Sequence, residues 1–518
     1  MMKLSANIIN FWRYHPALLY GVAFLLGFYC AFQQSWMLYI PIFLLLFPFF
    51  LSIKNELQNS KSLLLCIVSL LSAFSYGKMH YKFPDIPSDG LQGIAYVDIE
   101  SLSEQSSYFS KNWIYKCKLR EFIPTDSKIS IAHNINCSIR LPNKSQLNRP
   151  LANQSYLIDG LLIKNEGGHY SFKPQKDRDW NSVKGSWSLA EWRFHLKQKI
   201  ANFIKSSFSN HNSATFLGGL ATGEFDDRMM QLEFARFSLQ HIMAISGFHF
   251  AIIASILSFI FRLLVPRKIA AIMIVILLNT YFLFLGLSPS ILRAWMMISI
   301  AMIGYCLNKQ ASALNSLGIA LIGVLMVDPL MIETIGFQFS FLITGAILLY
   351  FTPIDYFLSK ILLKRSLSNV VDMDTWNQHA YCILCFFRQG LALTLAVNIA
   401  AIPVMLYYFN QFPLMSLFYN FFFPFFVSFS MLLLLIGIFV SSLIPLFGQF
   451  IHEINNIYTQ WILNLVYNLP RMSDYHYEIE GMPKDVVIIY LSFFFLTGIL
   501  LKQLVAEKTL DRQDFAFI

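Results

Sequence analysis

The segment "HIMAISGFHF", residues 241–250, places four polar or small residues inside a long apolar stretch. They are His241, Ser246, Gly247 and His249. Histidine and serine exchange hydrogen bonds, and histidine also titrates near neutral pH. Polar groups at membrane depth must find water, a partner helix or a substrate. The segment is therefore a candidate for the wall of a polar route through a membrane.

Three later apolar stretches carry further polar residues. Arg293 stands in "SPSILRAWMM", and an arginine at the centre of a membrane helix costs about 2.5–3.5 kcal/mol on insertion scales. We expect these residues to line or support the same route. The other polar residues in these stretches are Gln338 and Ser340 in "GFQFSF", and Asn398 and Asn420 on either side of "PVMLYYFNQFPLMSLFY".

The two histidines of the first segment do not have the spacing of a metal site. Residues eight apart lie about 80° apart around an ideal helix and about 12 Å along it, and the segment contains no Asp or Glu. No nucleophile–base pair is visible either. We therefore expect no catalytic residue, no metal and no cofactor, and a protein that is not an enzyme. The alternative is that both histidines are core residues bonded to neighbouring helices, with Gly247 serving close packing or a hinge.

Composition indicates an integral membrane protein. The chain has 518 residues, of which 56% are hydrophobic and 13% are charged, whereas soluble domains have about 25% charged residues. Stretches of the length that crosses a bilayer recur along it, so the expected fold is a polytopic α-helical membrane protein with about 10–12 transmembrane helices. They lie at about 16–33, 35–53, 62–78, 237–263, 269–286, 290–307, 311–327, 335–352, 389–409, 415–444 and 485–501.

The basic residues of the connections orient the spans. If the N-terminus is cytoplasmic, they fall on the inner side, as the positive-inside bias requires. The segment 84–210 then lies outside, the 353–388 loop lies inside, and the side of the C-terminus stays open. The first span is expected to be an anchor rather than a removable signal peptide. The basic residues that fall on the inner side are Lys3, Arg13, Lys54, Lys61, Arg262, Arg267, Lys268, Lys309, Lys360, Lys364 and Arg365.

The outer segment predicts a small β-barrel. Apolar and polar residues alternate over short runs separated by Asn, Gly, Pro and Ser, which is typical of strands. Five such strands within about 90 residues suit an oligonucleotide-binding-like barrel. A basic amphipathic helix, "LAEWRFHLKQKIANFIKSSF", follows, with Leu189, Trp192, Leu196, Ile200 and Phe203 at helical spacing, and we expect it to lie on the membrane surface. The strands are "GIAYVDI", "NWIYKCKL", "INCSIRL", "SYLIDGLLI" and "HYSFKP".

Positive charge concentrates in this outer part. Residues 111–205 include 17 basic and 7 acidic side chains, a net charge of +10. A basic face can bind nucleic acid, anionic lipid or another acidic polymer, and the alternative is an ordinary solvated surface. The basic residues expected to contact a nucleic acid strand are Lys116, Lys118, Arg120 and Arg140.

At these positions the chain resembles the ComEC family of competence proteins, the inner-membrane channel for single-stranded DNA in natural transformation. "HIMAISGFHF" is similar to that family's H-L-L-A-I-S-G-L-H-V stretch, and "IGFQFSFL" to its G-F-Q-L-S-F motif. "SPSILRAWMM" and "NIAAIPVMLYYFNQFPLMSLFYNFFFP" resemble its serine-arginine turn and its late Asn/Pro region. The order of spans, outer domain and core also matches over nearly the whole chain.

The resemblance implies a channel for single-stranded DNA in the cytoplasmic (inner) membrane. It favours a disulfide between Cys117 and Cys137, whose inward positions on adjacent strands otherwise leave bridged and free thiols equally open. It implies a periplasmic DNA receptor and a cytosolic ATPase or helicase as partners, and no Walker A motif appears in the chain itself. The zinc-binding H-x-H-x-D-H run of the family's nuclease domain does not occur, so a separate nuclease is expected.

The expected organisation has five parts. The alternative function is a cell-envelope glycan polymerase or ligase acting on lipid-linked sugars, and a small-solute transporter would be expected to show internal repeats, which we do not find. The oligomeric state is not indicated. The parts are three N-terminal spans (1–83), the outer β domain (84–187), the basic helix and connector (188–232), the multi-span channel core (233–505) and the tail (506–518).

Overall fold

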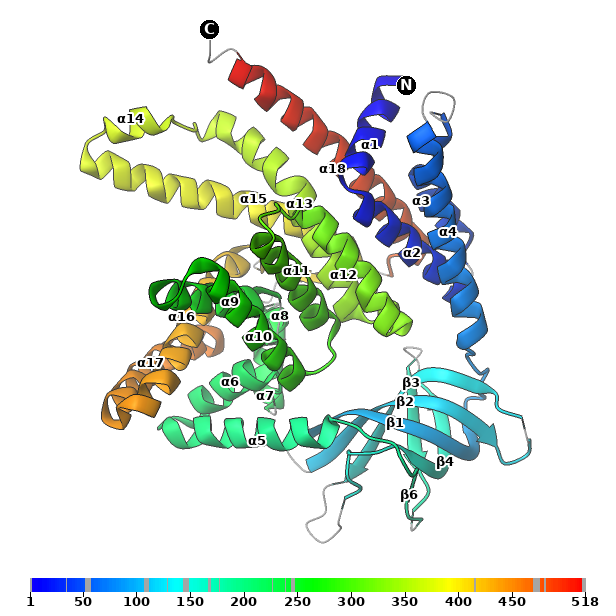
Figure 1. The fold of residues 1–518 in the computed structure, drawn as a ribbon. Helices are drawn as coiled ribbons and strands as arrows, with labels where there is room; N and C mark the ends of the chain where they lie inside the picture. The colour runs from blue at the N-terminus through cyan, green and yellow to red at the C-terminus, as the bar shows by residue number, and fades with distance from the viewer. Residues whose placement is uncertain are drawn as a thin grey trace. The chain divides into compact units, whose positions relative to one another are not determined.

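The computed structural model divides the chain into two compact units that interleave in sequence (Figure 1). Unit 1 contains Met1–Phe74, Met296–Pro424 and Met472–Ile518, and unit 2 contains Ser75–Trp295 and Phe425–Arg471. Residues 233–505, expected to form one channel core, contribute to both units. The structure describes residues 2–514 except 34, 52–56, 107–110, 128, 143–148, 166–168, 177, 226, 238, 244–246, 414–415, 469–475 and 479–480.

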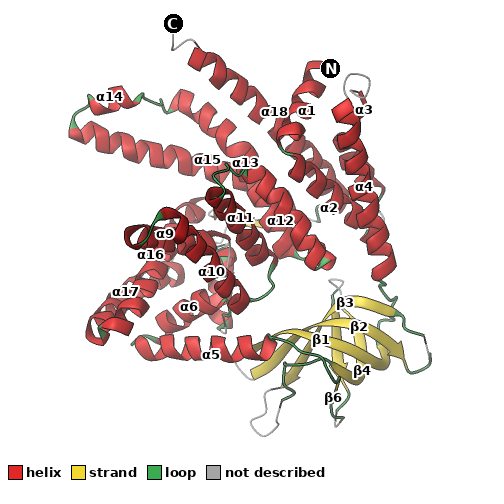
Figure 2. Cartoon of the chain, in the orientation of Figure 1, coloured by secondary structure: helices red, strands yellow, loops and turns green. Residues whose placement is uncertain are grey.

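Unit 2 begins with a five-stranded β-barrel, drawn in yellow in Figure 2. The strand order is β1-β2-β3-β5-β4, and pairing between β1 and β4 closes the barrel. All these pairings are antiparallel except β3 with β5, and the short β6 extends the sheet beyond β4. The strands are β1 (Leu91–Ser106), β2 (Lys111–Pro124), β3 (Ala132–Pro142), β4 (Tyr156–Lys164), β5 (Tyr170–Pro174) and β6 (Asn181–Ser182).

The predicted strands are confirmed because their period-2 pattern matches the pleat of the sheet. In β2 the side chains of Tyr115, Cys117 and Leu119 are buried in the barrel core, while Lys116 between the first two and Arg120 after the third are exposed. Alternate residues of a strand point to opposite faces, so one face fills the barrel and the other meets solvent. A barrel interior of this size is filled by side chains and leaves no pore.

Two paired glycines allow the strands to approach closely. Gly93 in β1 lies opposite Gly160 in β4. A Cβ atom at Gly93 would come within 2.3 Å of the carbonyl oxygen of Ile123, and one at Gly160 within 2.3 Å of the carbonyl oxygen of Lys173. Any larger residue at either position would push neighbouring strands apart.

The first turns of α5 (Ala190–Ser207) close one end of the barrel. Ala190 and Phe194 belong to the barrel core. Beside them the carboxylate of Glu191 accepts hydrogen bonds from both terminal nitrogens of Arg149, at 2.9 and 2.5 Å, and from the amide of Ala152 at 2.7 Å. The Arg149 guanidinium also lies over the rings of Trp113 and Phe194.

The helix itself is therefore predicted correctly, and its position on the membrane surface stays a prediction. The stripe expected to face the membrane includes Trp192 and Phe203, which are exposed, while Ala190, Phe194 and Ile204 are buried. Part of the positive charge is compensated, because Lys197 pairs with Glu224 at 2.8 Å. The helix thus serves the barrel on one face and presents an apolar face on another.

We predict that Glu191→Gln destabilises the barrel by about 3 kcal/mol, because Arg149 would keep a buried charge without a carboxylate. Burial on its own would raise the pKa of Glu191, but the hydrogen bonds from Arg149 and Ala152 outweigh it and the pKa lies below its ordinary value. The stabilisation is therefore complete above the ordinary glutamate pKa and is lost as pH falls through the lowered value.

Hydrogen exchange of the β2 and β4 amides in the intact chain measures this effect. The matched control is Asp159→Asn, which removes the exposed ion pair with Arg178 and should change stability by less than about 1 kcal/mol. Equal exchange in the two variants would contradict the prediction.

Cys117 and Cys137 lie directly opposite each other on β2 and β3. Both are buried, at 2% and 6% exposure, as expected from their inward positions. The structure holds both as thiols, and burial, followed by the neighbouring Cys137, raises the pKa of Cys117. The in-register pairing is compatible with a bridge, and the disulfide stays a prediction.

The rest of unit 2 is helical. Two of its helices begin with a side-chain N-cap. The side chain of Asn210 accepts hydrogen bonds from the amides of Asn212 and Ser213, and that of Asp227 accepts from the amides of Met229 and Met230. The helices after α5 are α6 (His211–Thr222), α7 (Arg228–Arg236), α8 (Gln240–Met243), α9 (Gly247–Leu264), α10 (Arg267–Leu285), the start of α11 (Pro289–Cys306), most of α16 (Ser416–Leu443), and α17 (Pro445–Tyr467).

The span expected at 237–263 is described in two parts, the short α8 and then α9 from Gly247. Residues 244–246 lie outside the described residues. The motif "HIMAISGFHF" therefore lies partly in α8 and partly in the first turn of α9, and a single continuous span over it stays a prediction.

Unit 1 holds most of the remaining spans. Thr334 caps α13 by accepting from the amide of Phe337. The elements are α1 (Met2–Tyr14), α2 (Pro16–Phe32), η1 (Trp36–Leu38), α3 (Tyr39–Leu51), α4 (Leu57–His80), most of α11, α12 (Ala313–Val327), η2 (Pro329–Glu333), α13 (Ile335–Ile361), α14 (Leu367–Val371), α15 (Thr375–Phe409), β7 (Gln411–Pro413), β8 (His476–Glu478) and α18 (Lys484–Asp514).

Seven of the described helices are long and apolar enough to cross a membrane. The pair α1–α2, bent by 98° at His15, would make an eighth. Three further predicted spans are helices of shorter apolar length in the structure: α3, α9 and α12. Every stretch expected to span contains a helix, but fewer than the predicted 10–12 have full spanning length.

The last helix of unit 1 runs antiparallel to α2. Near its start, Asp485 accepts a hydrogen bond from Ser35, just beyond the end of α2. Farther along, Lys502 donates to the carbonyl of Leu348 and lies close enough to His15, before the start of α2, to interact electrostatically. Figure 1 accordingly shows the start of α1 and the end of α18 at the same end of unit 1.

We therefore predict that reporter domains fused before α1 and after α18 lie on the same side of the membrane. A protease or membrane-impermeant label added from one side should reach both fusions or neither. A reporter inserted between α2 and α3 should give the opposite result. Labelling of the two terminal fusions from opposite sides would show that α18 does not cross beside α2.

Candidate functional site

The strongest polar site in unit 2 brings α9 and α11 together. A Cβ atom at Gly247 would lie 2.5 Å from Nη2 of Arg293, so the guanidinium rests directly against the glycine backbone. Nε of Arg293 is buried and has no hydrogen-bond partner among the described residues. His249, two residues along α9, is 3% exposed. A buried cation with an unmet donor is the kind of group that binds an anion or a hydrogen-bond acceptor.

Contacts between α10 and α11 hold Arg293 in place. Trp295 donates from its ring nitrogen to Oδ1 of Asn279 at 3.2 Å. Its ring also stacks on Phe282, with centroids 4.5 Å apart. Trp295 and Arg293 are two residues apart on α11, so they point to roughly opposite sides of that helix. With Trp295 fixed against α10, the side chain of Arg293 therefore points away from α10. The polar residues expected from the sequence do not include Asn279, although an amide in the middle of an apolar span also indicates a buried polar contact.

The other members of the motif differ in their surroundings. His241 lies in α8 and is exposed, whereas His249 is buried. The two lie close enough to interact electrostatically. Ser246 lies outside the described residues. Within the described part of the chain, no three His, Cys, Asp or Glu side chains are grouped as they would be around a metal ion.

A second polar group lies in unit 1, at the junction of η2, α13 and α15. Gln338 donates to the carbonyl of Ile332 at 3.1 Å and accepts from the hydroxyl of Tyr408 at 2.8 Å. Glu333 and Tyr29 lie close enough to Tyr408 to interact electrostatically. The structure thus adds Tyr29, Glu333 and Tyr408 to this group. The sequence did not reveal the two tyrosines, because α2 and α15 are far from η2 in the chain.

The remaining predicted channel residues of unit 1 do not meet at one point. Asn398 is 7% exposed and donates to the carbonyl of Thr394 in its own helix at 2.8 Å. The hydroxyl oxygen of Ser340 and Oδ1 of Asn420 are buried with no hydrogen-bond partner among the described residues. The predicted channel residues therefore fall into two groups, one in each unit.

The basic residues of the barrel share the outer face of β2 and β3. Lys116 lies opposite Ser138, and Lys118 opposite Asn136. Arg140 lies two residues after Ser138 in β3, so its exposed side chain is on the same face of the barrel. The amine of Lys118 also lies 5.7 Å from the centroid of the Tyr81 ring.

Arg120 differs from the other three. It forms an ion pair with Asp98 at 2.5 Å, and this hydrogen bond is the main reason that its pKa is raised. Asp98 also accepts from Ser155 at 2.6 Å. Much of the Arg120 charge is therefore already compensated within the barrel.

A comparison with protein families matches residues 222–504, more than half of the chain, to the family described as competence protein. The chain belongs to this family. The matched region of the competence protein holds α9, Arg293 and Gln338, and the resemblance to the ComEC family is confirmed. Together with the family, its long apolar helices indicate a multi-pass membrane protein.

One relative of this competence protein is ComE operon protein 3 of Bacillus subtilis (strain 168). The two are 24% identical over 322 residues, which are 61% of this chain and 37% of the relative. The match therefore spans well under half of that relative's length. No solved structure matches the chain.

Proposed function

We propose that this competence protein takes part in DNA uptake and passes single-stranded DNA across the cytoplasmic membrane. The observation that carries the proposal is the Arg293 guanidinium held against Gly247 among apolar helices. A cation at this place is costly unless it meets a polar ligand, and the phosphates of a passing strand are such ligands. His249, two residues farther along α9, is buried as well.

The barrel supports the proposal as the receiving domain. Its closed order of five strands, with β3 parallel to β5, suits an oligonucleotide-binding-like barrel. In such barrels the face of the second and third strands binds single strands, and here that face carries Lys116, Lys118 and Arg140. Cations on strands neutralise phosphates without reading sequence.

The orientation follows from the basic residues of the connections. With a cytoplasmic N-terminus, the barrel lies outside the inner membrane and the 353–388 connection lies in the cytoplasm. The antiparallel course of α2 and α18 then supports a cytoplasmic position for the end of α18 as well. A strand bound by the barrel would enter from outside.

The chain acts in this proposal as a transport protein without catalysis. A periplasmic DNA receptor would deliver the substrate, a cytosolic ATPase or helicase would supply the driving force, and a separate nuclease would remove the second strand. Membrane lipids surround the spans. These partners follow from the family resemblance.

Uptake of labelled DNA tests the function. Cells that lack this chain should bind DNA outside the cytoplasm but not import it, and the intact chain should restore import. Import that is equal with and without the chain would refute the proposal. An effect on extracellular glycan without an effect on DNA import would support a glycan polymerase or ligase instead.

We predict that the double substitution Lys116→Ala and Arg140→Ala weakens binding of a single strand in a salt-dependent way. Each phosphate contact to a single strand contributes about 0.7 to the slope of log K against log salt. Removing two contacts should therefore reduce that slope by about 1.4. Fluorescence anisotropy with labelled oligothymidine and the purified intact chain measures it.

The control for this experiment is Arg120→Ala, because Asp98 already compensates that charge. Arg120→Ala should reduce the slope of log K against log salt by much less than the double substitution does. An unchanged slope in the double variant would mean that this face of the barrel does not bind the strand.

A further inference from the structure

Arg193 on α5 lies where the barrel meets the end of a membrane helix, inside unit 2. Its Nε donates a hydrogen bond to the carbonyl oxygen of Leu283 at 2.8 Å. Leu283 belongs to the last turn of α10, which is long and apolar enough to cross a membrane. The next residue of α5, Phe194, is part of the barrel core. Arg193 therefore joins the helix that closes the barrel to the end of a candidate span.

The guanidinium of Arg193 rests against a glycine. Gly286 ends α10 with a φ of 95°, a backbone conformation that favours glycine. A Cβ atom at Gly286 would lie 3.7 Å from both Cδ and Nη1 of Arg193. The carbonyl end of a helix carries partial negative charge, which stabilises a cation placed there. The contacts with Leu283 and Gly286 thus hold the guanidinium in one place.

These contacts leave most of the hydrogen-bond donors of Arg193 unused. A guanidinium has five N–H donors, and the bond to α10 occupies only the one on Nε. In the part of the chain that the structure describes, Nη1 and Nη2 donate to no residue. The side chain is half-buried, and burial lowers the pKa of Arg193, but an arginine stays charged at neutral pH. A fixed cation with a planar pair of donors suits bidentate binding of a phosphate.

The basic face of the barrel lies close to Arg193. Glu100 of β1 is near enough to interact electrostatically with Arg193, and no ion pair joins the two in the described structure. The next residue, Ser101, lies opposite Lys116 of β2. Adjacent strands are about 4.8 Å apart. Arg193 therefore lies beside β1, one strand from Lys116 and two strands from Arg140 on β3.

The Arg293 site is within a short distance on the other side. Gly286 and Pro289 are three residues apart, and Arg293 follows four residues later in α11. An extended chain spans at most about 3.6 Å per residue and a helix rises about 1.5 Å per residue. The Cα atoms of Gly286 and Arg293 are therefore at most about 17 Å apart.

We propose that Arg193 binds a phosphate of the single strand where the strand passes from the barrel to the membrane helices. This inference rests on the proposed transport function. Lys116 and Arg140 would hold the strand on the barrel, Arg193 would take the next phosphate, and Arg293 would meet the strand among the helices. Bidentate binding of phosphate reads no base, so the contact suits any sequence.

A lipid headgroup offers the same phosphate chemistry, but it fits another side of α5 better. The exposed Trp192 and Phe203 lie about 20° apart around the helix, and Lys199 lies within about 40° of both. Arg193 points about 80–100° away from these two aromatic side chains, toward α10 and β1. If the apolar stripe faces the bilayer, a lipid phosphate therefore meets Lys199 before Arg193.

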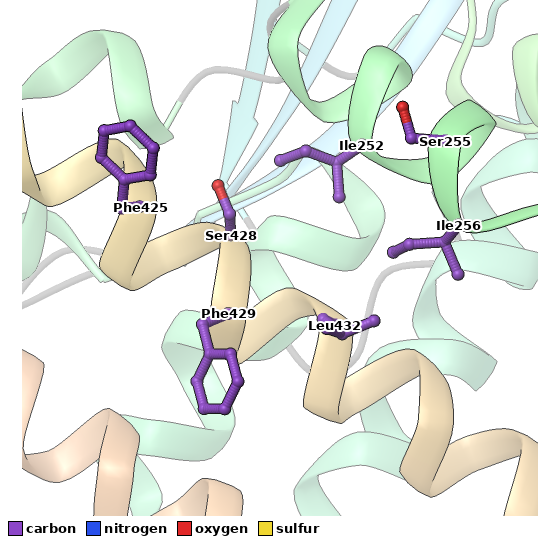
Figure 3. Close-up of a pocket in the computed structure, with 7 residues that line it drawn as sticks. All are labelled: Ile252, Ser255, Ile256, Phe425, Ser428, Phe429 and Leu432. Atoms are coloured by element: carbon purple, nitrogen blue, oxygen red, sulfur yellow. The ribbon is translucent and has the colours of Figure 1, made fainter. Parts of the chain in front are cut away.

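The groove between α9 and α16, about 420 Å³ in volume, offers no comparable site. Figure 3 shows Ile252 and Ser255 on α9 and Phe425 and Ser428 on α16 among the side chains that line it. None of the described residues that line this groove is charged. It therefore has no cation for a phosphate, whereas Arg193 has one with donors to spare.

Binding of oligothymidine to the purified intact chain in detergent tests the proposal. Arg193→Ala should lower the slope of log K against log salt by about 0.7, the contribution of one phosphate contact to a single strand. The affinity at a fixed salt concentration should fall about tenfold, as expected for the loss of charge-assisted hydrogen bonds. Lys199→Ala is the matched control, because it removes an exposed positive charge from the same helix, and it should change the slope much less.

Two further variants separate phosphate binding from a purely structural role at the end of α10. Arg193→Gln keeps an N–H donor for the carbonyl of Leu283 but has no charge, so it should lose the same part of the slope as Arg193→Ala. Arg193→Lys keeps the charge and should keep most of the slope. Hydrogen exchange of the amides in the last turn of α10 is measured on the same preparations. A loss of slope in Arg193→Ala that appears only together with faster exchange, and not in Arg193→Gln, would overturn the proposal.

The remaining outcomes separate this inference from the proposed function. If import depends on the chain while both uncharged variants keep the full slope, the inference alone fails. An equal loss of slope in Lys199→Ala would reduce the effect to general electrostatics and overturn it as well. Native mass spectrometry that finds less phosphatidylglycerol on Arg193→Ala, with an unchanged slope for oligothymidine, would assign the site to lipid instead. Import that does not depend on the chain would refute the transport function itself.

Discussion

Replacing Arg293 with leucine is expected to leave the chain in the membrane and to reduce DNA import about 100-fold. Leucine removes the insertion cost of a buried cation, about 2.5–3.5 kcal/mol, so the variant should insert at least as well as the unaltered chain. It also removes a charge-assisted hydrogen bond to the strand, worth up to about 3 kcal/mol, and that loss corresponds to the expected factor.

The measurement follows labelled DNA into the cytoplasm, with the amount of chain in the membrane determined in parallel. Binding of DNA by the barrel should be unchanged, because the barrel does not contain Arg293. Arg293→Lys should retain part of the import, since lysine keeps the charge but loses the planar donor array. Normal import by a well-inserted leucine variant would mean that Arg293 is only a helix contact.

The barrel was the most predictable part of the fold. In "NWIYKCKL" the alternation of apolar and polar residues has the same period as a strand, so local sequence and final structure agree. The same sequence could not show that Arg120 is paired with Asp98. That pair joins two strands, and its existence depends on their register rather than on local composition.

The membrane part was less predictable, and for a physical reason. Average apolarity locates helices but does not report how long each one is, so three predicted spans are shorter apolar helices in the structure. The contacts that define the sites also join helices distant in the chain. Arg293 against Gly247, Tyr408 with Gln338, and Arg193 with Leu283 all depend on helix packing, of which a single sequence carries no record.

The glycine at the start of α9 leads to the second large expected effect. Gly247→Ala should reduce DNA import about tenfold without removing the chain from the membrane. The new Cβ would lie 2.5 Å from Nη2 of Arg293 and 3.4 Å from Cβ of Ala294. The first distance is too short for two heavy atoms, so the guanidinium must move. It is the end of a flexible side chain, and the displacement should cost less than about 1 kcal/mol of stability.

The change therefore separates the position of the cation from its presence. Arg293 keeps its charge in the alanine variant, and only its place relative to the passing phosphates changes. A displacement that weakens one charge-assisted hydrogen bond by about 1.4 kcal/mol accounts for a tenfold effect. Thermal stability of the purified chain and import of labelled DNA are measured on the same preparations.

Gly218→Ala is the matched control, because no atom lies within 4 Å of the Cβ that it would add to α6. Alanine is the better helix former there, so the control should be at least as stable as the unaltered chain and should import DNA normally. If Gly247→Ala also imports normally, the exact place of the guanidinium does not limit transport. If it unfolds, Gly247 serves helix packing, and the position of Arg293 must then be tested through the Trp295 and Asn279 contact that orients it.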